Sequence, residues 1–323
     1  MNILFKGKDI PIFIVIVTYN AMPWLQKCLD SCKGYQVIIV DNKSTDGTIA
    51  FIKEKYPHMH LMPQKENLGF GQANNIGINY ALVQRAEYVF LLNQDAYLQE
   101  GCLDKLLSVQ RKNPDYGVLS PIHLNGKGGK LDENFSNYMV YKNNPHFYSD
   151  FILKNPLQQV YQVPFVNAAG WLLSKEVLET VGGFDPLFFH YGEDDNFCQR
   201  VRYHGYKVGV VPTAFLHHDR EERYQMEITH GSEEHFELME RNLKMRYANI
   251  NEENLDKLHK LLKRRQKNRQ RALFKLNFSN ANYLKKEIDL LKQIIPQIEK
   301  SRQLGIKKGG FLYLRDNERK VNF

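Results

Sequence analysis

The apolar run Val89-Phe90-Leu91-Leu92 ends abruptly in the polar residues Asn93-Gln94-Asp95. A short, uninterrupted run of this kind is typical of a strand buried on both faces in the parallel sheet of an α/β domain. Open α/β sheets bind their ligands just beyond the carboxyl ends of such strands. Asp95 is therefore a candidate to hold a divalent cation, Mg²⁺ or Mn²⁺, together with the phosphates of a substrate. The alternative is that Asp95 only caps the following turn.

Short apolar runs alternate with helical stretches over the first third of the chain. Three further runs precede the one at 89–92, and the segments between them carry apolar residues at helical spacing. This alternation predicts parallel strands joined by right-handed helical crossovers, which is the opening half of a doubly wound sheet. The expected strands are 10–17, 37–40 and 60–62, and the expected helices are 23–32, 48–55 and one that starts near residue 71.

Polar residues also follow the first two expected strands. Thr18-Tyr19-Asn20 follows the first, and Asp41 opens a cluster of Ser, Thr, Asp and Gly after the second. In the stretch 67–77, Gly69 and Gly71 let the backbone approach a ligand at the start of a helix. This stretch is not a dinucleotide fingerprint, because Asn74 replaces the third glycine and the preceding strand is weak.

The second half of the expected domain is less regular. The segment 122–155 is rich in Gly, Asn, Lys and aromatic residues without a clear period, which predicts a binding loop or lid. Three consecutive carboxylates, Glu193-Asp194-Asp195, open an expected helix at 194–204, where the helix dipole stabilises one or two negative charges. The aromatic residues just before them favour a partly enclosed site. The other expected elements are helices 100–112 and 176–181 and strands 116–120, 160–166 and 208–211.

From about residue 233 the chain is helical and charged, so we expect a domain at 1–232 and a basic extension at 233–323. Between residues 257 and 275 there are nine Lys or Arg and no Asp or Glu. This excess indicates an anionic neighbour, and a solvated helix face is the alternative. A membrane surface fits better than nucleic acid, because few aromatic residues are interleaved with the cations. An apolar stripe at 284–295 suits a dimer as well as a core, which leaves the oligomeric state open.

The composition predicts a globular protein. With 323 residues and 43% hydrophobic residues, the chain can bury a large core. The apolar run at 12–17 is too short to cross a bilayer, and the first residues lack the pattern of a secretory signal. Cys28 and Cys32 lie four residues apart on a helical apolar stripe, so we expect buried free thiols rather than a disulfide. These features predict a cytoplasmic location.

Seven groups of residues occur along the chain in this order: Val17-Thr18-Tyr19-Asn20; Val40-Asp41-Asn42-Lys43-Ser44-Thr45-Asp46-Gly47-Thr48; Asn67-Leu68-Gly69 with Asn74-Asn75-Ile76-Gly77; Asn93-Gln94-Asp95; Gly170-Trp171; Gly182-Gly183-Phe184-Asp185; and Gly192-Glu193-Asp194-Asp195. As an ordered set they resemble family 2 glycosyltransferases, in particular the bacterial rhamnosyltransferase-like branch. The resemblance covers about residues 10–220 and does not reach 233–323. It implies the GT-A fold of nucleotide-diphospho-sugar transferases, with a mostly parallel central sheet flanked by helices, and here with a C-terminal helical appendage.

The resemblance also implies a donor site. Asp95 matches the last acid of the family's D-x-D motif, which holds the metal that bridges the donor diphosphate. Asn93 stands at the first acid of that motif, and this departure leaves the dependence on Mg²⁺ or Mn²⁺ open. His218 matches the family's late histidine, as a metal ligand or phosphate contact, and a shift of one residue would put His217 there instead. The implied donor-binding residues are Thr18, Tyr19, Asn20, Asp41, Asn67, Asn74, Asn93 and Asp95.

Catalysis is implied by the acidic run. Asp194 matches the family's catalytic base, which removes the proton of an acceptor hydroxyl as that hydroxyl attacks the anomeric carbon opposite the leaving nucleoside diphosphate. One displacement with one base inverts the anomeric centre. Acceptor contacts are expected from Trp171, Glu193 and Asp195.

The implied function is transfer of a sugar from dTDP-rhamnose, or from a UDP-hexose, to a hydroxyl of a glycan or lipid-linked acceptor in cell-surface polysaccharide synthesis. A lipid-linked acceptor would place the protein at the inner face of the plasma membrane, in peripheral contact through its basic C-terminal helices. A nucleotidyltransferase would need a Gly-rich loop with Arg and Lys after the first strand, and the chain has Thr18-Tyr19-Asn20-Ala21 there. The alternative is a non-catalytic nucleotide-sugar or glycan-binding module. The presence of Asp41, Asp95 and Asp194 argues against it. No nucleic-acid partner is expected.

Overall fold

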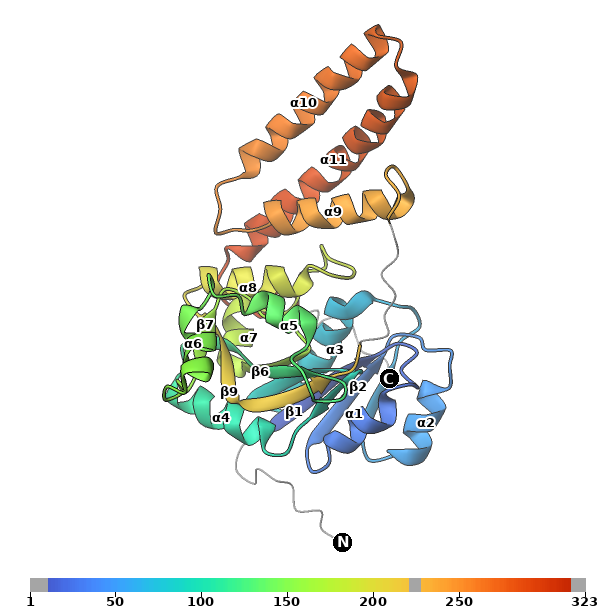
Figure 1. The fold of residues 1–323 in the computed structure, drawn as a ribbon. Helices are drawn as coiled ribbons and strands as arrows, with labels where there is room; N and C mark the ends of the chain where they lie inside the picture. Colours follow the sequence, from blue (N-terminus) through green and yellow to red (C-terminus); the bar gives the residue numbers. More distant parts are fainter. Residues whose placement is uncertain (1–10, 221–227, 315–323) are drawn as a thin grey trace.

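A computed structural model describes residues 11–220 and 228–314, and within them a nine-stranded mixed sheet lies between helices (Figure 1). The strand order is β3-β2-β1-β4-β8-β6-β9-β5, with β7 also paired to β9. The strands are β1 (Ile12–Thr18), β2 (Gln36–Asp41), β3 (His60–Pro63), β4 (Tyr88–Asn93), β5 (Ala96–Leu98), β6 (Tyr116–Asn125), β7 (Tyr161–Val163), β8 (Gly170–Ser174) and β9 (Lys207–His218). The helices are α1 (Leu25–Ser31), α2 (Thr48–Lys55), α3 (Gly69–Val83), α4 (Cys102–Lys112), α5 (Glu133–Tyr138), α6 (Pro145–Leu153), α7 (Lys175–Val181), α8 (Glu193–Tyr203), α9 (Glu233–Tyr247), α10 (Leu255–Phe274) and α11 (Phe278–Gly305).

The opening half of the sheet is parallel. β1 pairs with β2 on one side and with β4 on the other, and β3 extends the sheet beyond β2. The carboxyl ends of β1, β2 and β4 therefore lie side by side, which confirms the predicted doubly wound opening. The second half is mixed: β8 runs antiparallel to β4 and β6, whereas β6 and β9 are parallel to each other.

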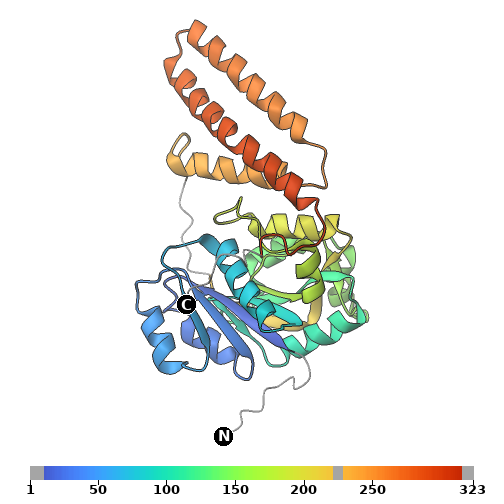
Figure 2. The same ribbon diagram turned by 180° about the vertical axis from the view of Figure 1, so that it is seen from behind.

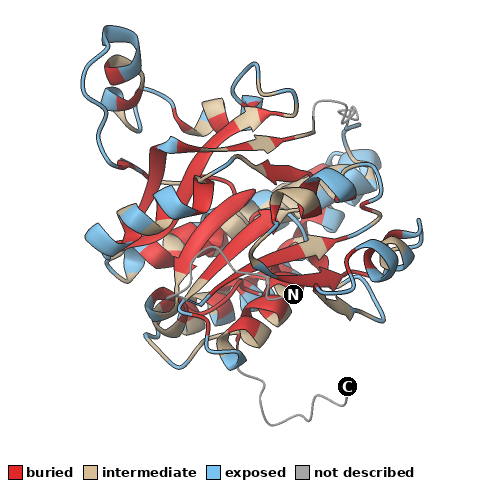
Figure 3. Cartoon of the chain, turned by 90° about the horizontal axis from the view of Figure 1, so that it is seen from below, coloured by how far each residue is buried: buried red, intermediate tan, exposed pale blue. Residues whose placement is uncertain are grey.

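Both faces of the central strands are buried (Figure 3). In β1, Phe13 and Val15 belong to the core on one face, and Ile14 and Ile16 belong to the core on the other. Since successive side chains of a strand point to opposite faces, a strand covered on both sides needs apolar residues throughout. This requirement accounts for the uninterrupted apolar runs in the sequence.

The segment 122–155 is more ordered than expected. β6 continues to Asn125 where the sequence predicted an end at residue 120, and β9 runs through Pro212 to His218 where it predicted 208–211. The register of this pair shifts between Pro121 and Ile122, which is where β-bulges accommodate proline. Buried polar residues such as His123, which is fully buried, break the apolar pattern of these strand ends. The prediction of an irregular loop was therefore wrong over β6, α5 and α6.

Three helices form the C-terminal extension (Figure 2). α10 and α11 form a hairpin whose apolar faces pack together, with Leu258, Ile294 and Ile298 fully buried, and the same cluster includes Phe188 of the sheet domain. After α11 the chain returns to the sheet domain, where the amide N–H of Gly183 donates to the carbonyl oxygen of Leu312 (2.8 Å). Leu314 is 3% exposed within the main core. The boundary between a domain at 1–232 and an extension at 233–323 remains our proposal.

All four cysteines are buried free thiols, as expected from the spacing of Cys28 and Cys32. In the part of the chain that the structure describes, no helix has the length and apolar character needed to cross a membrane.

Candidate active site

A cavity of about 620 Å³ opens at the carboxyl ends of β1 and β4. Its size is in the range of small-molecule sites. Eight of the predicted site residues line it, from the loops after β1 and β4, the start of α3, the start of α8 and the end of β9. These eight are Tyr19, Asn20, Asn67, Asn93, Asp95, Glu193, Asp194 and His218.

The loops after β1 and β4 are held to each other by a pair of hydrogen bonds. The Tyr19 amide donates to Oε1 of Gln94 (2.7 Å), and Nε2 of Gln94 donates back to the Tyr19 carbonyl oxygen (3.2 Å). Asn20 ties the first loop to the one after β2, because its Oδ1 accepts from the Thr45 amide (2.9 Å). These bonds fix the backbone of Tyr19 at the cavity, and its side chain is half-exposed.

Three predicted donor-binding residues lie outside the cavity lining. Asp41 is fully buried and accepts hydrogen bonds from Thr18 Oγ1 (2.8 Å), the Ser44 amide (2.9 Å) and Ser44 Oγ (2.6 Å). Asn74 is 2% exposed and donates to the Phe70 carbonyl oxygen within α3 (3.0 Å). This arrangement does not support direct donor contact by Thr18, Asp41 or Asn74. Asp41 instead shapes the turn from which its neighbour Asn42 lines the cavity.

The geometry does not support an acceptor contact by Trp171, which stays a prediction. The Trp171 side chain is fully buried on β8 and stacks against Phe184, with ring centroids 6.1 Å apart. Phe197 contacts the same indole from α8 (5.5 Å between centroids). Trp171 therefore packs the core beneath the acidic run and does not line the cavity. Asp195 also lies outside the cavity lining, so acceptor contact by this residue stays a prediction without support from the geometry.

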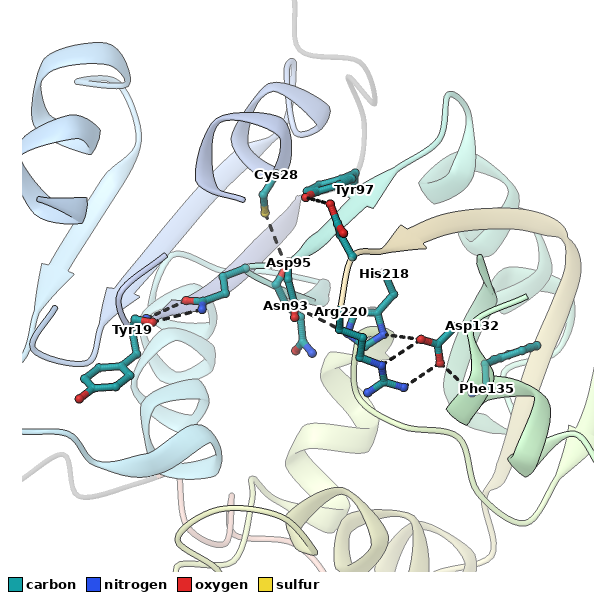
Figure 4. Close-up of polar contacts among 11 residues, drawn as sticks. Tyr19, Cys28, Asn93, Asp95, Tyr97, Asp132, Phe135, His218 and Arg220 are labelled. Carbon is teal, nitrogen blue, oxygen red and sulfur yellow. Dashed lines mark hydrogen bonds and ion pairs between the residues drawn. The ribbon is translucent and has the colours of Figure 1, made fainter. Parts of the chain in front are cut away.

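Asp95, His218, Asp132 and Arg220 form a connected polar network (Figure 4). β5 pairs with the end of β9, which sets Ala96 opposite His218 and brings the imidazole beside Asp95. His218 Nε2 lies 3.5 Å from Asp95 Oδ1, and its Nδ1 lies 3.6 Å from Asp132 Oδ2. The Arg220 guanidinium donates to both oxygens of Asp132 (2.9 and 2.7 Å). The imidazole thus lies between two carboxylates, and its Nδ1 has no hydrogen-bond partner among the described residues.

The choice between the two adjacent histidines is settled by the same strand pairing. His218 is 1% exposed and lines the cavity. His217 points to the opposite side of β9, where its Nε2 lies 3.1 Å from Nε2 of Gln99 and its Nδ1 lies 3.3 Å from the Gly126 carbonyl oxygen. Because successive residues of a strand face opposite ways, only one of the two can reach the site.

Asp95 and His218 are two candidate ligands for a divalent cation, and the described residues contain no group of three or more His, Cys, Asp or Glu side chains that could hold a metal ion without further ligands. A carboxylate oxygen and an imidazole nitrogen converge from Asp95 and His218, and both side chains are almost completely buried. The second nitrogen of His218 faces Asp132, as in many metal sites where a carboxylate orients the ligating histidine. The Asn93 Oδ1 atom, on the cavity wall next to Asp95, is buried without a hydrogen-bond partner among the described residues. An oxygen-rich site that is completed by substrate phosphates and water suits Mg²⁺ or Mn²⁺.

The acidic run begins α8 after Gly192, whose φ of 97° turns the chain into the helix. Burial raises the pKa of Asp194, while the backbone N–H groups of Asp195 and Ala168 act in the opposite direction. Burial and the charge of Asp194 raise the pKa of Glu193 to about 8 and that of Asp195 to about 7. Asp194 is therefore a carboxylate that faces the cavity and holds a proton more readily than an exposed aspartate.

Sequence reasoning missed several cavity residues. Asn134 and Tyr138 on α5 and Arg220 after β9 line the cavity, and Asp132 at the start of α5 lies behind the lining in contact with His218 and Arg220. Asp132 also caps α5, since its Oδ1 accepts from the Phe135 amide (2.8 Å). Arg220 lies two residues after His218, so its position in the sequence could have predicted that it lies near the site. Its partner Asp132 is 88 residues away from it, and no feature of the sequence indicates their contact.

The chain resembles characterised rhamnosyltransferases. It is 28% identical over 234 residues to the N-acetylglucosaminyl-diphospho-decaprenol L-rhamnosyltransferase of Mycobacterium tuberculosis, which covers 64% of this chain and 75% of the relative. It is 29% identical over 219 residues to the dTDP-rhamnosyl transferase RfbF of Shigella flexneri, with 64% of this chain and 68% of the relative covered.

Two solved structures share the fold. GalNAc-T7 with UDP, GalNAc and Mn²⁺ has a TM-score of 0.52 at 15% identity and covers 72% of this chain, which spans 48% of that protein. TarS of S. aureus (residues 1–349) in complex with UDP has a TM-score of 0.50 at 17% identity and covers 75% of this chain, which spans 65% of that protein. These likenesses confirm the expected GT-A fold.

Two family models match the sequence. The model described as the N-terminal domain of galactosyltransferase matches residues 168–230. The model of glycosyl transferase family 2 matches residues 13–182, more than half of the 323 residues, and the relatives place the match in its rhamnosyltransferase-like branch. The chain belongs to glycosyl transferase family 2.

Proposed function

We propose that this chain is an inverting glycosyltransferase that moves rhamnose from dTDP-rhamnose, or a hexose from a UDP-sugar, to a hydroxyl of a glycan or lipid-linked acceptor. The names of the two rhamnosyltransferase relatives, one acting on a decaprenol-linked sugar and one using a dTDP donor, support this choice. The product would serve cell-surface polysaccharide synthesis, with the reaction at the cytoplasmic side of the plasma membrane.

One observation carries the proposal: Asp194 lines the same cavity as the Asp95–His218 pair. A sugar transfer needs a group that neutralises the leaving diphosphate and a base that takes a proton from the acceptor. His218 comes from β9, Asp194 comes from α8, and Asp95 comes from the two-residue turn between the strands β4 and β5. A donor in this cavity would lie between them.

Asp194 would accept the acceptor's proton as the new glycosidic bond forms, and with one displacement the anomeric centre inverts. Its raised pKa favours this role, because a base works best when its pKa approaches the working pH. Glu193, largely protonated at neutral pH, would donate a hydrogen bond to the acceptor through its unpartnered Oε2. Arg220 would contact the anionic part of the donor, since only part of its guanidinium is used by Asp132.

Asp95 and His218 would hold a divalent cation, with Asn93 Oδ1 beside them. When bound, the cation would neutralise charge that develops on the leaving nucleoside diphosphate. Asp132 would keep the His218 ring in place, and Arg220 would keep Asp132 ionised. Burial alone would raise the pKa of Asp132, but the hydrogen bonds from Arg220 and the Phe135 amide outweigh it and leave the pKa lowered.

Calorimetric titration with a panel of nucleoside diphosphates and nucleotide sugars, with and without Mn²⁺, tests the donor site. We expect metal-dependent binding of one donor, and we expect Asp95→Ala to weaken it by about 100-fold because the carboxylate between cation and protein is lost. Asp104→Ala, on the exposed side of α4, serves as the control and should bind like wild type. Binding without metal would refute the cation site, and absence of binding to the whole panel would refute the proposed donor site.

Replacing Asp132 by Asn tests the support of His218. Asn keeps an oxygen that caps α5 but cannot hold both Arg220 and the His218 ring as a carboxylate does. We expect Mn²⁺ affinity in the presence of nucleotide to fall about 10- to 100-fold, the usual effect of removing such a supporting group. Asp150→Asn is a matched control, because Asp150 is equally buried and accepts from Tyr161 Oη (2.8 Å) away from the cavity. Equal losses in both variants would mean that general destabilisation, not support of His218, explains the effect.

A further inference from the structure

The connection between α10 and α11 exposes several large apolar side chains. Phe274 is 91% exposed, Leu276 73%, Phe278 61% and Leu273 39%. They lie within six residues at the end of the hairpin that points away from the sheet, as both views of the ribbon show (Figures 1 and 2). Single exposed apolar residues are common on proteins, but four of them at one extremity form a patch that indicates contact with another surface. We call these four residues the hairpin tip.

The side chains of the hairpin tip lie outside the buried contacts between α10 and α11. Near the tip, Ala272, Ala281 and Leu284 form a small buried cluster between the helices. The turn itself is closed by backbone hydrogen bonds, from the Leu276 amide to Leu273 (3.0 Å) and from the Asn277 amide to Ala272 (2.9 Å). Asn277 Oδ1 then accepts from the Asn280 amide (3.1 Å) and caps α11. The exposed side chains therefore have no packing role within the described part of the chain.

The net positive charge of the protein is concentrated in the hairpin. Residues 255–305 contain fourteen Lys or Arg and four Asp or Glu, so their formal excess of ten positive charges is larger than the +8 of the whole chain. Lys263, Lys267, Arg271 and Lys275 are exposed and spaced four residues apart, which puts them along one side of α10 toward the tip. Like charges at this spacing repel and destabilise a helix. Such a stripe is understandable if an anionic surface neutralises it.

We propose that the α10–α11 hairpin docks end-on to an anionic lipid surface, with the hairpin tip inserted among the lipid headgroups and the basic side of α10 against their charges. An apolar tip combined with adjacent cations is the arrangement that membrane interfaces favour, because they offer hydrocarbon and negative charge at neighbouring depths. The hairpin then connects the lipid surface to the catalytic domain, through α9 and the cluster that holds Phe188.

Other occupants fit less well. A second copy of this chain would bring an equally positive hairpin to the contact, so tip-to-tip association would be repulsive. A nucleic acid or an acidic protein would neutralise the basic stripe but would leave Leu273 and Leu276, which are aliphatic, in water. A lipid surface satisfies the tip and the stripe together.

Co-sedimentation of the full chain with vesicles tests the proposal without any donor or acceptor. We expect binding to vesicles of phosphatidylcholine and phosphatidylglycerol (about 3:1) and little binding to phosphatidylcholine alone, because cations near the surface contribute strongly. The double substitution Phe274→Ser and Phe278→Ser should weaken binding about tenfold or more, since it removes the inserted apolar surface. Lys263→Gln, Lys267→Gln and Arg271→Gln together should weaken binding about tenfold or more, as should raised salt.

A rival apolar patch supplies the matched control. Ile152 and Leu153 at the end of α6 are 74% and 68% exposed, and Ile152→Ser with Leu153→Ser should leave vesicle binding unchanged. The proposal is overturned if this α6 variant loses binding, or if the Phe274→Ser and Phe278→Ser variant binds like wild type. Retained nucleotide-sugar binding in the hairpin variants would show that they are folded and would separate this proposal from the proposed activity.

Fluorescence of the tip gives an independent readout. In a Phe274→Trp variant, the new indole should shift its emission to shorter wavelength when phosphatidylglycerol-containing vesicles are added, after subtraction of the signal of Trp24 and Trp171 from the wild-type chain. A Val83→Trp variant, at an exposed apolar position of α3, should show no shift. An unshifted emission at position 274 on vesicles that bind the protein would refute insertion.

Discussion

Replacement of Asp194 by Asn is expected to lower kcat about 1,000-fold while nucleotide-sugar binding stays near the wild-type value. Asn has nearly the same shape as Asp but cannot accept the acceptor's proton, and positioned bases contribute about 100- to 10,000-fold to rates. Donor binding should persist, because the Asp95–His218 pair and the loops after β1 and β4 are unaffected. Initial rates with a lipid-linked or glycan acceptor, together with calorimetry of the donor, measure the two effects separately.

The pH dependence gives a second test of the same residue. Asp194 acts only when ionised, and burial raises its pKa above the ordinary value of an aspartate, about 3.9. We therefore expect kcat of the wild-type enzyme to fall as pH decreases through this raised pKa, at a pH where exposed carboxylates are still ionised. In Asp194→Asn the remaining activity should lack this step.

The neighbouring acids supply controls. Asp195→Asn changes the adjacent carboxylate, which does not line the cavity, and should alter kcat only a few-fold. Glu193→Gln copies the neutral acid that a pKa of about 8 implies at pH 7, so kcat should change less than about tenfold. If Asp195→Asn or Glu193→Gln causes the large loss and Asp194→Asn does not, the base has been assigned to the wrong residue. If neither the wild-type protein nor any variant turns over a sugar that it binds, the result favours the alternative that the chain is a non-catalytic nucleotide-sugar or glycan-binding module.

The fold was predictable because its central strands are buried on both faces. The apolar runs at β1, β2 and β4 follow directly from that burial, and the polar residues at their ends mark the edge where the cavity opens. The prediction ended β6 and β9 too early, because buried polar groups such as His123 and the bulge near Pro121 replace the apolar pattern there. A periodicity of apolar residues cannot reveal a strand whose buried positions are polar.

The candidate site was predictable only where a residue belongs to a local motif. Asp95, Asp194 and Asn20 each stand at the end of a strand or the start of a helix, so the sequence position alone places them at the cavity. Asp132 enters the site through a contact with Arg220 across 88 residues, which no local pattern encodes. Trp171 also belongs to a local motif, but its side chain is fully buried on β8 and does not line the cavity, so a local motif does not by itself place a side chain in the site.

The return of the C-terminal segment to the sheet domain was also hidden in the sequence. Residues 306–314 carry no apolar period, yet Leu314 is buried in the main core and Leu312 pairs with Gly183. Arg200 on α8, which is only 1% exposed, contacts this region through the ring of Tyr313. A buried arginine in an amphipathic helix resembles an exposed one in sequence, because both stand among polar residues.

Replacement of Arg200 by Met is expected to lower the free energy of unfolding by about 3–5 kcal/mol, the usual effect of breaking a buried charged network from one side. The guanidinium donates to the carbonyl oxygens of Val181 (2.7 Å) and Gly183 and to Asn196 Oδ1 (3.0 Å). Without it these buried acceptors lose their donors, at about 1–3 kcal/mol each. Asp185, which is 4% exposed, would also lose a nearby positive charge.

Urea unfolding followed by circular dichroism measures this effect, with Arg202→Met as the matched control. Arg202 lies on the same helix two residues later but is exposed, and its replacement should change stability by less than about 0.5 kcal/mol. Arg200→Lys should fall between Arg200→Met and wild type, because an ammonium keeps the charge but not the planar set of donors that reaches three acceptors. Since Arg200 also lies against the Tyr313 ring (5.5 Å to the centroid), Arg200→Met should make the segment after α11 more sensitive to limited proteolysis. Equal stability of Arg200→Met and Arg202→Met would show that the C-terminal segment is held by apolar contacts such as Leu314 alone, and that the buried arginine is dispensable.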